Sequence, residues 1–156
     1  MNYYRMFHDV EHPTLATAGS ACIDIRAYQP EESISVQRVH PGGCFSIDPG
    51  QRCLISTGLK LDIPESFSVR IHPRSGLAIK HGITLVNAEG VIDSDYVEEL
   101  KVPIINLSDV PYIIKHGERI CQAELVFSPS VEPTEIAAPP TPRTNRAGGF
   151  GSTGKH

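Results

Sequence analysis

The stretch RCLISTGLKLDI, from Arg52 to Ile63, is the longest of a series of short runs that decide the fold class. Most of these runs alternate apolar with polar residues or are rich in Val and Ile, as β-strands are. The others are CIDIRAY, ESISVQRV, CFSID, FSVRIH, GITLV, ELKVPIINL, PYIIKHG and RICQAELVF. Turn-forming groups such as HPGG, DPGQ and NAEG separate them. Many short strands at such spacing predict an all-β sandwich or barrel.

Proline and helix signals refine this prediction. Proline is expected at strand edges, because it cannot donate to the ladder; the prolines concerned are Pro49, Pro64, Pro73, Pro103 and Pro111. One segment, Arg74 to Gly82, has a Ser before an apolar run and a Gly at its end. It predicts a single helix of about two turns.

Composition limits the classes of function. The formal net charge of −4 argues against a nucleic-acid-binding surface, although a local group of arginines can still hold a small polyanion. No run approaches the roughly 18 apolar residues of a membrane span, and the first residues lack the apolar core of a signal peptide. A soluble, cytoplasmic protein is therefore expected. The cysteines form no C-x-x-C pair, so we expect buried free thiols rather than zinc ligands at Cys22, Cys44, Cys53 and Cys121.

The composition changes after Phe127. Five prolines in SPSVEPTEIAAPPTPRTNR predict a stiff spacer over residues 129–145, between a domain of residues 1–128 and a glycine-rich segment of residues 146–156. Gly149 to Lys155 fits the start of a P-loop, but His156 stands where Ser or Thr is needed and no apolar strand precedes it. The P-loop interpretation therefore fails. Such a segment is usually a disordered tail, yet Phe150 is a candidate anchor.

Four further stretches carry residues suited to chemistry, and each leaves two interpretations open. In AGSACIDIRA, Asp24 is either a surface residue or an inward carboxylate that pairs with arginine or hydrated magnesium. In HPRSGLA, Ser75 is either an ordinary helix cap or part of an anion site at a helix start, with Arg74 just before it. Arg119 in GERICQAEL is either a phosphate donor like Gln122 or a partner of a buried carboxylate such as Asp24.

The stretch NAEGVIDSDYVEEL contains two aspartates two residues apart. On a strand, Asp93 and Asp95 would share one face, which suits metal binding or general-base chemistry. A polar hairpin tip is the alternative.

Taken in order, AGSACIDIRA, PRSGLA, GVIDSDY, GERICQ and GGFGSTG closely resemble the five motifs of the trimeric deoxyuridine triphosphatase (dUTPase) family, over about Ala18 to Gly154. The resemblance implies a jelly-roll-like β-barrel of the β-clip type, with one short helix and a flexible C-terminal arm. It implies a homotrimer whose active sites each take residues from all three chains. It also implies hydrolysis of dUTP to dUMP and pyrophosphate with Mg2+, by water attack on the α-phosphorus.

The resemblance also assigns roles to residues. Asp93 resembles the carboxylate that orients the attacking water, and Tyr96 the tyrosine that excludes a 2′-hydroxyl. The resemblance implies no direct protein ligand for magnesium, and it implies that Asp24 acts either through magnesium-bound water or through an arginine partner. The base and phosphate contacts in the body are Arg74, Ser75, Gly76, Asn87, Gly90, Val91 and Gln122. Those in the arm are Arg146, Phe150, Gly151, Ser152 and Thr153, with Phe150 stacking on uracil and glycines that let the backbone approach.

Three positions depart from the family pattern. The arginine before the arm's phenylalanine is displaced by one residue, so Arg146 or Arg143 would meet the γ-phosphate. Glu98 stands where Gly is usual, so we expect a different return strand in the uracil hairpin. Cys22 replaces Gly or Ala, a difference of packing. The alternatives are a dCTP deaminase-type enzyme, which shares the fold but lacks the arm, and an added protein-binding regulatory role, for which the turn of residues 37–43 is a candidate surface.

Overall fold

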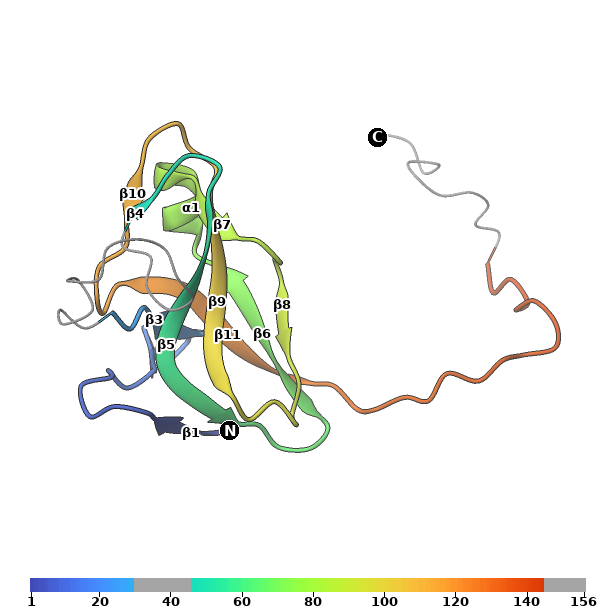
Figure 1. Ribbon diagram of the computed structural model, residues 1–156. Coiled ribbons are helices and arrows are strands. Elements are labelled where there is room, and N and C mark those ends of the chain that lie inside the picture. Colours follow the sequence, from blue (N-terminus) through green and yellow to red (C-terminus); the bar gives the residue numbers. More distant parts are fainter. Residues whose placement is uncertain (30–45, 145–156) are drawn as a thin grey trace.

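The computed structural model describes residues 1–29 and 46–144, and within these ranges the chain forms eleven strands and one helix (Figure 1). The segment ESISVQRV and residues 145–156 lie outside them. The strands are β1 (Asn2–Arg5), β2 (Thr14–Leu15), β3 (Ile23–Arg26), β4 (Ser46–Ile47), β5 (Arg52–Asp62), β6 (Phe67–Pro73), β7 (Ile83–Leu85), β8 (Gly90–Ile92), β9 (Glu99–Asn106), β10 (Tyr112–Ile113) and β11 (Arg119–Phe127). The helix is α1 (Ser75–His81).

The described strands pair into sheets that bring distant parts of the chain together. One sheet has the order β1-β5-β9-β7, a second has the order β2-β3-β11-β6-β8, and a small third pairs β10 with β4. The pairings are antiparallel. In the five-stranded sheet β11, near the end of the body, lies between β3 and β6. This arrangement confirms the all-β, jelly-roll-like prediction with one short helix.

The two larger sheets enclose one hydrophobic core. Along β9 every second residue is buried, and β5 follows the same alternation over its first half, because successive side chains of a strand point to opposite faces. A register shift between Ser56 and Lys60 interrupts the ladder to β9. Gly58 lies in this shift with φ 67°, and a Cβ there would come within 2.5 Å of Val10 Cγ2. The bulge therefore requires glycine.

Helix α1 matches the segment that the sequence predicts. Arg74 is its N-cap residue but makes no side-chain capping bond, and Gly82 ends it with φ 66°. The Gly82 N–H donates to the carbonyl of Ala78 at 3.1 Å. A Cβ on Gly82 would lie 2.6 Å from the backbone nitrogen of Ser108, so close packing as well as φ selects glycine here.

Three sequence-based expectations need correction. Strands β1, β2 and β8 were not predicted, because they are short and lack a clear apolar alternation. Pro103 lies inside β9 rather than at its edge. The carbonyl of Pro103 accepts a hydrogen bond from the N–H of Val86, the residue after β7. The ring nitrogen of Pro103 therefore faces the side of β9 on which the pairing with β7 has ended, so no donor is needed there. Cys53 is disulfide-bonded rather than free. Cys121 is free and buried as expected, Cys22 is free but only partly buried, and Cys44 lies outside the described residues.

After β11 the described chain forms no further strand or helix. Residues 129–144 are exposed and lead away from the body (Figure 1). Since α1 has only seven residues, no helix in the described ranges is long and apolar enough to cross a membrane.

Candidate active site

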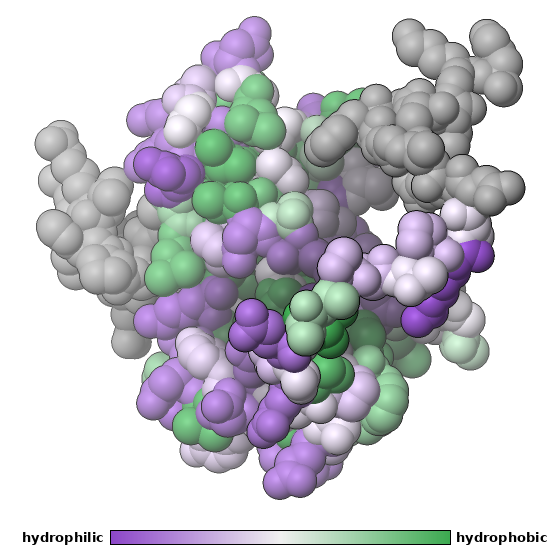
Figure 2. All heavy atoms as spheres, turned by 90° about the vertical axis from the view of Figure 1, so that its right-hand side faces the viewer, coloured by the Kyte–Doolittle hydropathy of each residue, from purple (hydrophilic) through white to green (hydrophobic). Residues whose placement is uncertain are grey.

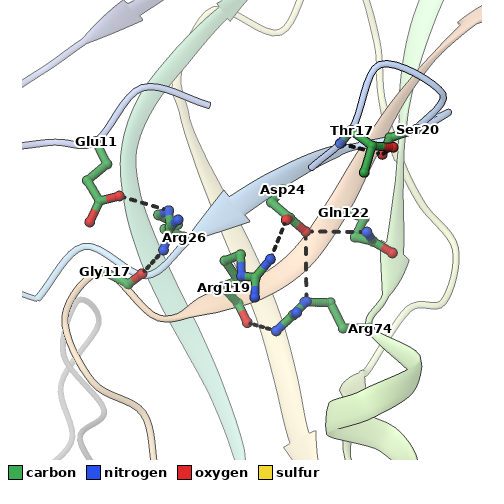
Figure 3. A network of polar contacts seen from close by, with 9 residues as sticks. All are labelled: Glu11, Thr17, Ser20, Asp24, Arg26, Arg74, Gly117, Arg119 and Gln122. Atoms are coloured by element: carbon green, nitrogen blue, oxygen red, sulfur yellow. Dashed lines mark hydrogen bonds and ion pairs between the residues drawn. The ribbon is translucent and has the colours of Figure 1, made fainter. Parts of the chain in front are cut away.

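A buried carboxylate lies at the centre of a polar cluster on the five-stranded sheet (Figure 3). Asp24 of β3 is only 5% exposed. Its Oδ2 accepts a hydrogen bond from Arg119 Nη1 at 3.0 Å, and its Oδ1 accepts from Gln122 Nε2 at 3.3 Å. Arg74 Nε lies 3.8 Å from the same Oδ1. A buried charge is tolerated when it is paired and hydrogen-bonded in this way.

Strand register explains the contact between Asp24 and Gln122. The two residues lie opposite each other in the β3–β11 pair, and Gln122 also lies opposite His72 on the other side. Ile25 and Cys121, one position along, are buried in the core. Alternation therefore puts Asp24, Gln122 and His72 in one row on the outer face of the sheet.

Arg119 joins this row because the strand is irregular. Arg119 and Gln122 are three residues apart, so in a regular strand their side chains would point to opposite faces. A register shift between Arg119 and Cys121 changes the alternation, and both side chains then contact Asp24. The sequence left Arg119 open between phosphate donor and carboxylate partner, and in this structure it is a partner of Asp24.

Arg74 is held by two acceptors at the start of α1. Its Nη1 donates to the backbone carbonyl of Arg119 at 2.9 Å, and its Nε faces Asp24. Two guanidinium groups thus surround one carboxylate and leave one positive charge in excess. Ser75 and Gly76 follow in the first turn of the helix and are exposed. A Cβ built on Gly76 would have no neighbouring atom within 4 Å. The result is an open, locally positive surface on a chain whose formal net charge is −4.

The segment from Asn87 to Tyr96 crosses from one sheet to the other. β7 belongs to the four-stranded sheet, whereas β8 pairs with β6 at the edge of the five-stranded sheet, with Gly90 opposite Ile71. The described residues therefore do not form the predicted hairpin with a return strand. A Cβ on Gly90 would lie 3.4 Å from Asn87 Nδ2, so Asn87 covers Gly90 closely.

The aspartates of this segment lie in a turn rather than on a strand. Asp93 follows β8, its carbonyl accepts from the Tyr96 N–H at 3.2 Å, and both Asp93 and Asp95 are exposed. The interpretation in which they share a strand face is therefore wrong. Tyr96 is 41% exposed, and its hydroxyl donates to the carbonyl of Glu99 at 3.0 Å. Glu98 points to Lys60 at 3.5 Å, in an exposed ion pair.

The candidate residues of one chain do not form one site. Ile92 lies opposite Val69 on β6, so the next residue, Asp93, lies close to the first half of β6. Arg74 follows the other end of β6, five residues after Val69. Five residues of extended chain span roughly 16 Å, at about 3.3 Å per residue. The structure thus brings together Asp24, Arg74, Arg119 and Gln122 but leaves Asp93 away from them. Val91 is 46% exposed on β8, and the predicted arm residues lie outside the described ranges.

Fold and cluster together define a class, that of jelly-roll-like β-clip proteins with an arginine-rich polar cluster where two sheet strands meet a short helix. A family model for dUTPase matches residues 43–154, and the chain belongs to this family. The chain is 43% identical over 143 residues, 91% of its length, to the deoxyuridine 5'-triphosphate nucleotidohydrolase of Finegoldia magna, of which it covers 90%.

Solved structures show the same fold. The Staphylococcus bacteriophage 80alpha dUTPase with dUPNHPP superposes with a TM-score of 0.79 at 20% identity, covering 98% of this chain and 97% of that one. The dUTPase from phage phi11 of S. aureus, described with a structural Mg(II) ion, gives a TM-score of 0.71 at 18% identity over 88% of this chain and 96% of that one.

Proposed function

We propose that this chain hydrolyses dUTP to dUMP and pyrophosphate, and that the excess positive charge around Asp24 binds the triphosphate. The observation that carries this proposal is the pair Arg74 and Arg119 beside one buried carboxylate, next to the open start of α1. Guanidinium groups are strong donors to phosphate oxygens, and Arg74 is already oriented by the carbonyl of Arg119. Ser75, Gly76 and Gln122 supply further donors at the same place.

Asp93 is the proposed general base. It is exposed and lies in a turn at the end of a strand, where a carboxylate can orient a water molecule for attack. The backbone between Asn87 and Tyr96, with Gly90 and Val91, is proposed to bind the uracil edge. Tyr96 is fixed by its bond to Glu99 and would leave no room for a 2′-hydroxyl.

Magnesium fits this site as an ion carried by the substrate. Both oxygens of Asp24 already accept hydrogen bonds from protein groups, so they are not free ligands, although each can still accept from a water of a hydrated ion. The proposed role of the exposed Asp93 is to orient the attacking water, not to ligate the ion. When bound to the triphosphate, magnesium supplies charge neutralisation at the leaving pyrophosphate.

We further propose that the active protein is a homotrimer. Asp93 and Arg74 lie roughly 16 Å apart along β6, so a substrate phosphate that meets both must lie between chains. Val97 and Phe127 are 66% and 65% exposed, and hydrophobic residues reach the surface on the side from which residues 128–144 leave (Figure 2). Such groups suit contact with other copies.

The arm belongs to the same proposal. Residues 1–128 form the body, 129–145 a linker and 146–156 an arm, in which Phe150 stacks on the base and Gly151, Ser152, Thr153 and Arg146 or Arg143 hold the γ-phosphate. An arm that closes over the substrate would exclude water from the site.

Mixing two inactive variants tests the shared site. Asp93→Asn and Arg74→Ala should each lower pyrophosphate release by on the order of a hundredfold. If each site takes Asp93 from one chain and Arg74 from another, random trimers refolded from equal amounts should regain about a quarter of wild-type activity, since one of four chain combinations is intact at each site. Activity that stays at the level of the single variants would contradict a site shared between chains.

Substrate preference tests the proposed reaction. Uracil offers an acceptor, a donor and an acceptor along one edge, and cytosine reverses two of these. Each unpaired buried group would cost roughly 1–3 kcal/mol. We expect kcat/KM for dUTP to exceed by far the values for dCTP, dTTP and UTP. Ammonia release from dCTP would indicate the deaminase alternative instead.

A further inference from the structure

A second group of reactive side chains lies beside the Asp24 cluster and has no part in the proposed reaction. The thiol of Cys22, the imidazole of His72 and the carboxylate of Glu124 each offer one ligand atom, and these atoms all lie within 4.8 Å of one another. All three residues are partly exposed, so an ion from solvent can reach them.

Sheet register brings the three residues together from separate parts of the sequence. On β11, Gln122 lies opposite His72 and Glu124 lies opposite Arg70, which makes His72 and Glu124 diagonal neighbours. The β3–β11 register pairs Ile23 with Ala123, so one further step places Cys22 opposite Glu124. Since alternate residues share a face, Cys22, His72 and Glu124 lie on the same outer face.

We propose that Cys22, His72 and Glu124 bind a zinc ion, with a fourth position left for water. A tetrahedral zinc site with Zn–N and Zn–O distances near 2.05 Å and Zn–S near 2.3 Å has ligand atoms about 3.3 to 3.6 Å apart. His72 Nε2 and Glu124 Oε2 are 3.2 Å apart, close to this spacing. A shift of about 1 Å in side-chain position brings the thiol into the same geometry.

The neighbours of His72 support this assignment. Its other ring nitrogen, Nδ1, lies 3.7 Å from Glu89 Oε2, and Glu89 is held in turn by Arg70 at 3.3 Å. A carboxylate at Nδ1 favours the tautomer that leaves Nε2 free to bind metal, an arrangement common around zinc-bound histidines. One sulfur, one nitrogen and one oxygen ligand suit zinc, whereas magnesium requires oxygen ligands.

Absence of C-x-x-C spacing does not weigh against this site. Such spacing marks zinc ligands that are close in sequence, while here β6, β11 and the residue just before β3 supply one ligand each. The competing explanation is a plain ion pair between His72 and Glu124 on the surface of the sheet. The two explanations differ in what they require of Cys22, since only a metal site needs its sulfur.

Metal binding to the full chain distinguishes them. Metal-free protein, without nucleotide and without added thiols, is titrated with Zn2+ in competition with a chromophoric chelator. We expect one zinc per chain, and a loss of affinity above about 100-fold in Cys22→Ser and in the near-isosteric Glu124→Gln. Glu89→Gln should cost about 10- to 100-fold, the effect of removing an outer partner of a ligating histidine.

Cobalt reports the sulfur bond directly. Co2+ in place of Zn2+ should give a near-ultraviolet thiolate-to-cobalt band that disappears in Cys22→Ser. The band should persist in Cys121→Ala and in His8→Gln, which remove the other described free thiol and an exposed imidazole outside the cluster. Unchanged circular dichroism shows that each variant folds. No stoichiometric binding, or binding that Cys22→Ser and Glu124→Gln leave unaltered, would overturn the proposal without touching the proposed dUTP hydrolysis.

Discussion

Replacing Asp24 with Asn measures how strongly the buried carboxylate holds the cluster. The change keeps side-chain volume, so it opens no cavity, and it removes one charge at a position only 5% exposed. The hydrogen bond from Arg119 at 3.0 Å is charge-assisted and contributes about 1.5–3 kcal/mol. The 3.8 Å contact with Arg74 has no hydrogen bond, so it adds less than about 1 kcal/mol.

Two effects reduce the expected loss. The Arg119 side chain is 43% exposed, so water replaces part of the lost interaction. Gln122 can rotate its amide to accept from the new Asn amide, which lets the Asn oxygen stay with Arg119. We therefore expect Asp24→Asn to lower the free energy of unfolding by about 2 kcal/mol, nearer the lower end of the charge-assisted range.

Urea unfolding at one fixed protein concentration measures this loss. Asp109→Asn, an exposed aspartate, is the matched control and should change stability by no more than about 0.5 kcal/mol. If Asp24→Asn lost no more than the control, the carboxylate would not be what holds Arg74 and Arg119 in place.

Four other changes have defined outcomes. Gly82→Ala should lower stability by about 1–3 kcal/mol in the same assay, because its Cβ would meet the Ser108 backbone at 2.6 Å and its φ is 66°. Burial raises the pKa of the Cys121 thiol above its ordinary 9.0, so the unfolded chain releases this proton first; this thiol should lower stability above pH 9 by about 1.4 kcal/mol per pH unit, and Cys121→Ala should have a slope that is smaller by this amount. Tyr96→Ala should raise the kcat/KM of UTP relative to dUTP more than that of dCTP, and an unchanged sugar preference would move this role elsewhere. Ending the chain at Thr144 should leave dUMP binding intact but lower dUTP turnover steeply, and full turnover would make the last residues a passive tail.

The sequence predicted the parts of this structure that depend on local patterns. Alternation along β5, β9 and β11 identified the long strands, and the Ser and Gly around α1 located the helix. Asp24 and Gln122 were found because a polar residue within an apolar strand is conspicuous. These signals are carried by a few neighbouring residues and do not depend on the partner strand.

Features set by strand pairing were beyond the sequence. The register shift next to Arg119 decides which face of the sheet its side chain takes. No residue in GERICQ indicates this shift. The crossing of β8 to the other sheet placed Asp93 in a turn instead of on a shared strand face. Pro103 looked like an edge signal because the sequence does not show where the neighbouring strand β7 ends.

The position of β11 between β3 and β6 affects the order in which the chain can fold. Its contact with β3 joins residues nearly a hundred positions apart, and closing a loop of that length makes such pairing slow. During synthesis β3 leaves the ribosome long before β11. Until β11 pairs with it, β3 has an unpaired edge and the charge of Asp24 is not neutralised. The carboxylate meets its arginine partner only when the last strand of the body has been made. A nascent or truncated chain that ends before β11 should therefore bind no phosphate and depend on chaperones that protect exposed strands.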